Sequence, residues 1–279
     1  MAVLPGGGVG PPERKLQMDL NLTGRVAVVT GGGSGIGEAA CMALAEAGAA
    51  VAVVDIRPEP ARAVAEKVTA VGGRAIALTA DVADEEAVSA AITQAATTLG
   101  GLHVVFANAG INGMQTPIDE MTLDEWHATV ETNLTGTFLT VKHSIPHLRA
   151  AGGGSIVTTA SVNGNTLFSL PGYAAYSTSK AGVVAFTKMA ALELARWEIR
   201  VNAILPGAIN TNIGERTYRR NLDRVDYGFQ PPAKWPPLRG KPAQASEVGD
   251  LVVFLASNAS SYMTGAELLL DAAYTLWRG

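Results

Sequence analysis

The sequence is short of several residue types and patterns, and each shortage excludes a class of protein. It has one cysteine, Cys41, so no intrachain disulfide can form, and we expect a reducing compartment, the cytoplasm. No run of 18 apolar residues occurs, so we expect no membrane-spanning helix. Only 16% of the residues are charged and the net charge is −4, which lacks the basic character of a nucleic-acid-binding protein.

Metal-ligating residues are also sparse. His143 and His147 are four residues apart, but no nearby Asp, Glu or Cys completes a ligand set. We therefore expect surface histidines and no metal site. Cys41 falls within a helical pattern and is expected to be a small core residue.

Apolar residues and glycine, in contrast, are plentiful. The 279 residues are 48% hydrophobic and include 31 glycines, enough to form a sizeable core. The first 18 residues are rich in Gly and Pro and lack the apolar centre of a signal peptide. We expect a flexible leader over residues 1–21 and a single folded domain over residues 22–279.

Short apolar runs alternate with stretches of helical periodicity. The predicted strands are Arg25–Thr30, Val51–Asp55, Ala75–Thr79, His103–Ala107, Ser155–Thr159, Arg200–Ile204 and Glu267–Leu270. The predicted helices include Glu59–Val71, Asp84–Leu99, Leu123–Leu148, Tyr176–Ala195 and Ser246–Ala256. Continuous Val, Ile and Ala in the strands indicate burial on both faces. The pattern predicts an α/β fold with one doubly wound parallel sheet of about seven strands flanked by helices.

A glycine-rich turn joins the first predicted strand to a helix. It reads Thr30-Gly31-Gly32-Gly33-Ser34-Gly35-Ile36-Gly37. Glycines allow the backbone to approach a pyrophosphate, and the helix N-terminus offers free N–H groups to it. A flexible turn is the alternative, because the spacing is not a strict G-x-G-x-x-G. The position between a strand and a helix favours dinucleotide binding.

Asp55 ends the second predicted strand, 20 residues after Gly35. A carboxylate there can accept hydrogen bonds from both ribose hydroxyls and would repel a 2′-phosphate, so it favours NAD over NADP. Asp55 could instead be a solvated acid at a strand end. Arg57 could argue for a 2′-phosphate, but the carboxylate at the strand tip is the nearer group.

Taken with further motifs, the chain from about Leu22 to Thr275 resembles the classical short-chain dehydrogenase/reductases. The family's T-G-x3-G-x-G motif matches Thr30–Gly37, and its Asn-Ala-Gly motif matches Asn108-Ala109-Gly110. Its adenine-contacting acid matches Asp81, its helix asparagine Asn133, its serine Ser161 and its Y-x3-K pair Tyr176 and Lys180. Its Pro-Gly motif matches Pro206-Gly207, followed by Ile209 and Thr211.

The resemblance implies a Rossmann fold, an NAD(H)-dependent oxidoreductase of secondary alcohols and ketones, and a homotetramer built through helices around Leu123–Leu148 and Tyr176–Ala195. The implied catalytic residues are Asn133, Ser161, Tyr176 and Lys180. The implied cofactor-binding residues are Gly31, Ser34, Gly35, Ile36, Gly37, Asp55, Ile56, Asp81, Val82, Asn108, Ala109, Gly110, Tyr176, Lys180, Pro206, Gly207, Ile209 and Thr211.

The chain departs from the family pattern in three places. Ser161 and Tyr176 are 15 residues apart, slightly more than usual, which predicts a longer loop over Val162–Gly172. Tyr173 lies closer to the serine, but Ser177 rather than lysine follows it by four residues. The family's Asp-Gly-Gly near the C-terminus is Asp271-Ala272-Ala273 here. Gly33 stands where NADP-preferring relatives often carry a basic residue, which again favours NAD.

The helical spacing of two of these residues, together with the resemblance, predicts their chemistry. Tyr176 and Lys180 share a helix face, and a nearby ammonium would lower the pKa of the tyrosine so that it serves as general acid/base. Ser161 would hydrogen-bond the substrate oxygen. By resemblance, Lys180 also holds the nicotinamide ribose, and Asn133 positions a water that links Lys180 to solvent. Asn133 could instead bond a backbone carbonyl, and Ser161 could be an ordinary turn serine.

A segment at residues 211–241 differs in composition from the rest. It is rich in Arg, Lys, Pro and aromatic residues and is predicted to be an insertion beyond the carboxyl ends of the strands. It could be a mobile substrate lid whose basic residues receive an anionic substrate, or a solvated surface or subunit contact; we favour the latter.

Two other functions are open. One is an NADPH-dependent 3-oxoacyl-thioester reductase, against which Asp55 speaks. The other is a non-catalytic dinucleotide-binding regulator, against which the intact set of four catalytic residues speaks.

Overall fold

The computed structural model describes residues 18–166, 171–225 and 237–276. Most of the predicted leader, residues 1–17, lies outside the described residues, as do parts of the two predicted loops, residues 167–170 and 226–236.

The centre of the molecule is a seven-stranded sheet in which every neighbouring pair of strands is parallel. Its strand order is β11-β7-β6-β4-β1-β2-β3. The strands are β1 (Val26–Thr30), β2 (Ala50–Asp55), β3 (Arg74–Thr79), β4 (Val104–Ala107), β6 (Gly154–Thr159), β7 (Ile199–Pro206) and β11 (Glu267–Leu270). The order reverses between β1 and β4, the arrangement of a doubly wound dinucleotide-binding sheet. The predicted fold class is confirmed.

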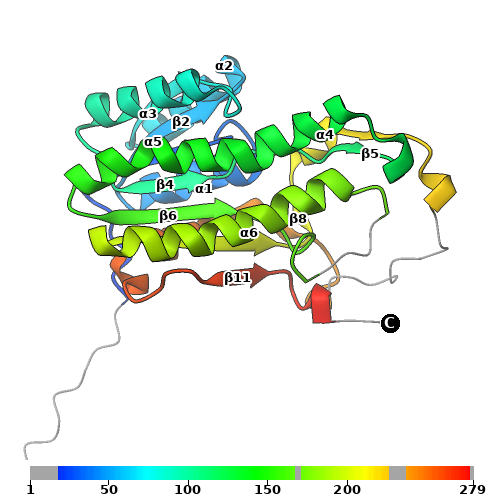
Figure 1. Cartoon of the computed structure of the whole chain (residues 1–279). Coiled ribbons are helices and arrows are strands. Elements are labelled where there is room, and N and C mark those ends of the chain that lie inside the picture. The colour runs from blue at the N-terminus through cyan, green and yellow to red at the C-terminus, as the bar shows by residue number, and fades with distance from the viewer. Residues whose placement is uncertain (1–17, 167–170, 226–236, 277–279) are drawn as a thin grey trace, which may run out of the picture.

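Helices cover both faces of this sheet, so the molecule has three layers (Figure 1). One face packs against α3 (Glu85–Leu99), α5 (Gly136–Ala150) and α6 (Ala174–Leu194). The other packs against α1 (Gly35–Glu46), α2 (Pro58–Ala70) and α7 (Ala245–Ala256). Helices α5 and α6 run side by side, joined by an edge-to-face contact of Phe138 with Phe186.

Strand β1 shows why the apolar runs in the sequence are continuous. All five of its residues are buried. Val26 and Val28 face the layer of α3, α5 and α6, while Ala27 and Val29 face the layer of α1, α2 and α7. Successive side chains of a strand point to opposite faces, so a strand covered on both sides needs apolar residues at every position. Cys41 is buried in the second layer, as predicted.

The structure corrects one predicted helix. The expected helix Leu123–Leu148 consists of α4 (Leu123–Val130), a π-helical turn (Glu131–Thr135) and α5. A π-helical turn inserts one residue into the helical repeat and is frequent at functional sites. Here it carries Asn133.

Two small sheets were not predicted. In one, β8 (Ile209–Asn210) pairs with β10 (Ala243–Gln244). In the other, β5 (Gly113–Gln115) pairs with β9 (Thr217–Arg219) in parallel. The second pair brings the segment after β7 against the segment after β4, beyond the carboxyl ends of the main strands (Figure 1). In the described part of the chain no helix is long and apolar enough to span a membrane.

Candidate active site

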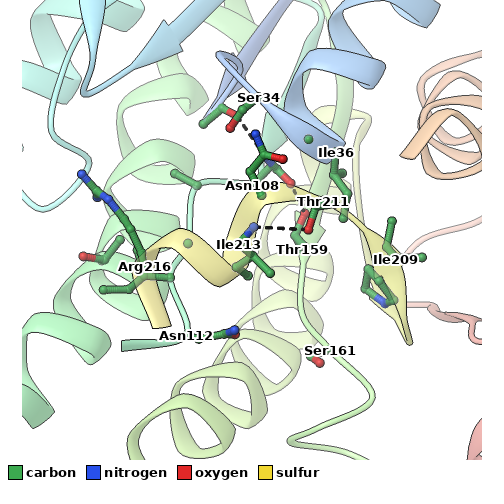
Figure 2. A pocket seen from close by; sticks show the side chains of 18 of the residues that line it. Ser34, Ile36, Asn108, Asn112, Thr159, Ser161, Ile209, Thr211, Ile213 and Arg216 are labelled. Atoms are coloured by element: carbon green, nitrogen blue, oxygen red, sulfur yellow. Dashed lines mark hydrogen bonds between the residues drawn. The ribbon is translucent and has the colours of Figure 1, made fainter. Parts of the chain in front are cut away.

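A cavity of about 470 Å³ lies at the carboxyl ends of the central strands. Its walls come from the turns that follow β1, β2, β3, β4, β6 and β7, and from the start of α6. This is the crevice in which doubly wound folds bind ligands. In Figure 2, Ser34, Ile36 and Asn108 lie at one end and Ser161 and Asn112 at the other, with the ribbon of Thr211, Ile213 and Arg216 between them.

The glycine-rich turn forms the first end of the cavity. Gly31 has φ +64°, and a Cβ at Gly37 would lie 2.0 Å from the carbonyl oxygen of Gly31. No side chain fits at Gly37, so the helix start approaches the turn closely. Helix α1 begins at Gly35, and its first N–H groups are therefore free to meet a phosphate. This cradle fits the pyrophosphate of a dinucleotide.

Asp55 stands at the tip of β2 and is only 7% exposed. Its Oδ2 accepts the Gly33 N–H at 3.0 Å, and its Oδ1 accepts the Arg57 N–H at 3.0 Å. The Arg57 guanidinium lies beside it, with Nε 3.6 Å from Oδ1. A Cβ at Gly33 would lie 2.8 Å from Oδ2, so a side chain there would displace the carboxylate. Both carboxylate oxygens are thus held by backbone donors at the cavity wall.

Asn108, directly after β4, ties three strands together. Its Nδ2 donates to the carbonyl of Thr30 at 3.1 Å, and its Oδ1 accepts from the Thr159 hydroxyl at 3.1 Å. Its own N–H donates to the Thr30 hydroxyl. This side chain therefore holds the ends of β1, β4 and β6 in fixed positions around the cavity.

Three polar side chains converge at the other end. Ser161 follows β6, while Tyr176 and Lys180 lie one turn apart on α6 and are 9% and 3% exposed. The Lys180 ammonium donates to the Thr159 carbonyl at 2.7 Å, and its Nζ is 5.9 Å from the centroid of the Tyr176 ring. Helical spacing therefore brings the predicted pair to one face, as expected.

The electrostatics of this pair correct the expectation from spacing. Burial raises the pKa of Tyr176, and a hydrogen bond with Ser161 opposes that rise only in part. Burial also lowers the pKa of Lys180 from 10.5 to about 8. Desolvation is the main cause of both shifts, because burial disfavours the charged form of each group.

Asn133 lies behind the cavity wall and is fully buried. Its Oδ1 accepts the Ile111 N–H at 2.8 Å, and its Nδ2 donates to the Ile111 carbonyl at 2.9 Å and the Ser179 hydroxyl at 3.0 Å. Its side chain thus clamps the segment after β4 onto α6.

Nearly all the predicted site residues meet at this cavity. Every predicted cofactor-binding residue lines it except Gly37, which packs behind Gly31, and every predicted catalytic residue lines it except Asn133. Several other lining residues carry no motif and were not predicted: Ile111, Asn112, Thr132, Asn163, Ile213 and Arg216. Tyr173, which the sequence analysis weighed against Tyr176, also lines the cavity.

Residues 211–225, which we term the covering segment, dock through side-chain ion pairs. Arg220 forms a two-pronged pair with Glu125, at 2.7 and 3.0 Å. Arg224 pairs with Asp119 at 3.1 Å and also with Glu120. Two of the basic residues of this segment therefore neutralise acids around the start of α4. They are not simply solvated, and they are not available to a ligand. Arg216, in contrast, lines the cavity.

The Asp271-Ala272-Ala273 sequence adopts a backbone suited to glycine. Ala272 has φ 52° and Ala273 has φ 65°, both left-handed. Asp271 holds the turn by accepting from the Ala273 N–H and from the N–H and hydroxyl of Thr275. Left-handed alanines are strained, so the turn is maintained by its contacts rather than by its own preference.

Comparison with known proteins decides the family. A family model described as short chain dehydrogenase matches residues 25–221. The chain belongs to the short-chain dehydrogenase/reductase family. This dehydrogenase is therefore an oxidoreductase that acts on CH–OH donors with a nicotinamide dinucleotide.

Three similar proteins illustrate its relationships. The dehydrogenase is 36% identical to cyclohexanol dehydrogenase of Acinetobacter sp. strain SE19, over 92% of this chain and 98% of that protein. It is 39% identical to cis-4-hydroxycyclohexanecarboxylate dehydrogenase of Sinomonas cyclohexanicum, over 90% and 96%. The solved structure of a 3-ketoacyl-ACP reductase from Sinorhizobium meliloti 1021 superposes with a TM-score of 0.87 at 39% identity, covering 91% of this chain and all of that one.

Proposed function

We propose that this dehydrogenase interconverts a cyclic secondary alcohol and its ketone with NAD(H), and that Tyr176 is the general acid/base. The observation that supports this most is that Ser161, Tyr176 and Lys180 meet in one cavity whose other end carries the glycine turn and Asp55. The cyclohexanol and 4-hydroxycyclohexanecarboxylate relatives favour a ring alcohol as substrate.

The proposed chemistry needs one hydride and one proton to leave the alcohol. A bound nicotinamide dinucleotide supplies the hydride acceptor, or the donor in the reverse direction. Ser161 hydrogen-bonds the substrate oxygen. Tyr176 first releases its own phenol proton towards solvent beside Lys180, and the phenolate then takes the hydroxyl proton as the C=O bond forms. In the reverse direction Tyr176 is already protonated at neutral pH, because burial raises its pKa, and can give its proton to the carbonyl oxygen.

Lys180 and Asn133 support that proton transfer. With a pKa of about 8, Lys180 is mostly an ammonium at neutral pH and favours the phenolate form of Tyr176 when the proton moves. We also propose that Lys180 binds the ribose of the nicotinamide nucleotide. Asn133 bonds Ile111 through Oδ1 and Nδ2 and Ser179 through Nδ2, so we regard it as a positioning residue that holds the β4 turn against α6. A water between Lys180 and solvent remains part of this proposal.

The preference for NAD over NADP rests on Asp55. Its carboxylate is held at the ribose end by the Gly33 N–H, and a 2′-phosphate would meet its negative charge. Asp55→Ala should weaken NAD binding more than NADP binding in thermal-shift titrations. An unchanged ratio of the two dissociation constants would reject this assignment.

A 3-oxoacyl-thioester reductase is the second candidate, favoured by the structural likeness to a 3-ketoacyl-ACP reductase. The Asp55 carboxylate would repel the 2′-phosphate of NADPH, so it argues against a thioester reductase that requires NADPH. Assays with a 3-oxoacyl thioester and NADPH, beside cyclohexanol and NAD, separate the two functions by which pair turns over faster.

Tyr176→Phe tests the catalytic assignment. Removing the hydroxyl should reduce turnover about 10²- to 10⁴-fold. The thermal stabilisation by NADH should remain, because the phenyl ring keeps the packing. Full turnover in the variant would show that another group is the base. Retained NADH binding with no activity in the wild type towards any alcohol or ketone would favour a non-catalytic regulator.

We also propose a cytoplasmic homotetramer. Phe138 on α5 and Met189 and Leu192 on α6 are exposed apolar residues on neighbouring helices, with Leu192 75% exposed. Leu192→Glu should reduce the mass measured by light scattering, and an unchanged mass would exclude this face as the contact.

A further inference from the structure

Asn112 lies in the segment that joins β4 to β5, and its side chain lines the cavity. In Figure 2 it lies at the same end as Ser161. Its Nδ2 donates to the hydroxyl of Thr217 in the covering segment at 2.9 Å. Thr217 pairs with Gly113, the residue after Asn112, where β9 joins β5. The covering segment therefore holds a side chain that belongs to the cavity wall.

The bond to Thr217 fixes the direction in which the Asn112 carboxamide is turned. The Thr217 hydroxyl has one proton, which it donates to the Ile213 carbonyl at 3.1 Å. Towards Asn112 this hydroxyl can only accept, so the Asn112 atom beside it must be the amide nitrogen. The amide oxygen, Oδ1, therefore points away from Thr217. Among the described residues none donates to Oδ1, which is not sealed from the cavity.

Tyr173 supplies a second polar group to this end of the cavity. It lines the cavity, and its ring meets the Tyr176 ring edge to face, with centroids 5.7 Å apart. Burial raises the pKa of Tyr173, so its hydroxyl is protonated and can donate at neutral pH. The Thr116 N–H donates to the Gly172 carbonyl at 3.3 Å, which holds the chain next to Tyr173 against the end of β5.

The two side chains select the chemistry of a ligand group. Asn112 offers an acceptor, Tyr173 offers an O–H donor, and both are neutral. A carboxylate has no proton for the Asn112 oxygen and would be repelled by it. An ammonium group has no lone pair for Tyr173, and it would add a second positive charge to the end that holds Lys180. A hydroxyl donates to one side chain, accepts from the other and carries no charge.

We propose that Asn112 and Tyr173 form a subsite for a second hydroxyl of the substrate, so that the substrate class is a ring diol. The Asn112 Oδ1 accepts the proton of that hydroxyl, and Tyr173 donates to its oxygen. Thr217 is a positioning residue that keeps the Asn112 carboxamide in the required orientation. This inference rests on the proposed function, because the hydroxyl that reacts is the one held by Ser161 and Tyr176.

The first test compares substrates with one and two hydroxyls. The specificity constant kcat/KM with NAD is measured for cyclohexanol and for the three positional isomers of cyclohexanediol. The wild type should prefer at least one diol by more than its two reactive hydroxyls explain. Asn112→Leu and Tyr173→Phe should each lower the diol-to-cyclohexanol ratio about 5- to 50-fold, because each leaves one hydrogen bond of the second hydroxyl unmade. A wild type that prefers cyclohexanol to all three diols would contradict the subsite.

Two further variants test the orientation of the carboxamide and the specificity of the effect. Thr217→Val keeps Asn112 but removes the hydroxyl that orients it, and it should lower the same ratio about two- to fivefold. Asn212→Leu makes the same change of side chain at another residue that lines the cavity, and it should leave the ratio unchanged. An equal fall of the ratio in Asn112→Leu and Asn212→Leu would contradict the role of Asn112.

A binding measurement separates this inference from the proposed function. An alcohol cannot react in the complex with NADH, because both are already reduced, and its binding can be followed by the fluorescence of the bound NADH. At least one diol should bind this complex about fivefold or more tightly than cyclohexanol, and Asn112→Leu should abolish the difference while the affinity for NADH stays within about twofold. If the diol binds through Asn112 but no alcohol is oxidised, the proposed function fails and the subsite stands. If alcohols are oxidised but Asn112→Leu changes neither the ratio nor this affinity, the subsite is wrong.

Discussion

The two ends of the cavity are built in different ways. At the nucleotide end, Asp55, Gly31 and Asn108 are held by backbone groups of β1, β2 and β4, and the glycines exclude side chains altogether. At the other end, the covering segment docks through side-chain pairs: Arg220 with Glu125 is half-buried, and Arg224 with Asp119 is exposed. One end is built into the sheet, and the other is attached through the short β5–β9 backbone pairing and through side-chain ion pairs.

We expect the glycine-turn end of the site to tolerate few amino-acid substitutions and the covering segment to tolerate more. Backbone hydrogen bonds in a buried sheet depend on the whole fold, whereas exposed ion pairs are individually weak and screened by salt. Substitutions in the covering segment are therefore expected to disturb the fold less than substitutions at the glycine turn.

The largest effect is expected from Lys180, whose charge is buried beside Tyr176. Lys180→Met should reduce turnover about 10²- to 10⁴-fold. It should also raise the free energy of unfolding at pH 7 by about 1 kcal/mol. The lowered pKa means that burying the ammonium destabilises the folded wild type by about 3 kcal/mol, which the variant avoids. The variant also loses the hydrogen bond to the Thr159 carbonyl, which offsets about 1–3 kcal/mol of that gain.

The pH dependence of that stability gain has a definite sign. Below pH 8 the folded wild type carries the buried charge, so the gain of Lys180→Met is complete. Between pH 8 and 10.5 the folded state loses the proton before the unfolded state does, so the wild type recovers and the gain disappears. Denaturant unfolding at pH 7 and pH 10.5 checks this, and a gain that does not change with pH would contradict it.

The next largest effect should come from Gly37→Ala at the nucleotide end. The new Cβ would overlap the Gly31 carbonyl, so the turn must move. We expect a loss of about 1–3 kcal/mol in unfolding free energy and of most of the roughly 2.7 kcal/mol of stabilisation that NAD gives at 100 times its dissociation constant. Gly214→Ala in the covering segment is the control, because nothing lies within 4 Å of its Cβ position. Equal effects of the two substitutions would remove the distinction between the ends.

A smaller effect is expected at the covering segment itself. Arg220→Gln should raise KM for the alcohol about two- to fivefold with little change in kcat, since it loosens the docking without touching the chemistry. The effect should vanish in 1 M salt and stay constant from pH 5 to 8, because Arg220 holds the pKa of Glu125 at about 2. Arg239→Gln, which breaks a pair with Glu247 instead, is the control. A salt-insensitive KM would contradict docking by ion pairs.

The smallest effect should come from Ala272→Gly and Ala273→Gly. Each removes a left-handed alanine, and each should add about 0.5–1 kcal/mol to the free energy of unfolding after the extra backbone entropy of glycine is subtracted. Ala47→Gly, at φ −73°, is the matched control and should destabilise the protein. Thermal unfolding of the three variants measures this, and a loss of stability at residues 272 and 273 would show that the turn is unstrained.

The sequence predicted the glycine-turn end of the cavity better than it predicted the covering segment. The seven strands and the nucleotide-end residues were predicted because they depend on apolar runs and on spacings within a few residues. The docking of the covering segment was not, because its contacts join residues about a hundred positions apart, such as Arg219 with Gln115 and Arg220 with Glu125. The distance between two residues along the sequence does not predict contacts between residues so far apart.

The sequence by itself determined the sheet, the glycine turn, the acid at the tip of β2 and the helix face shared by Tyr176 and Lys180. These are local features, since the period of a strand or helix and the freedom of glycine act over a few residues. Only the tertiary structure decided the π-helical turn around Asn133, the direction of the pKa shift of Tyr176 and the meeting of Asn112 with Thr217. Burial and long-range pairing set these, and both arise only when distant segments pack together.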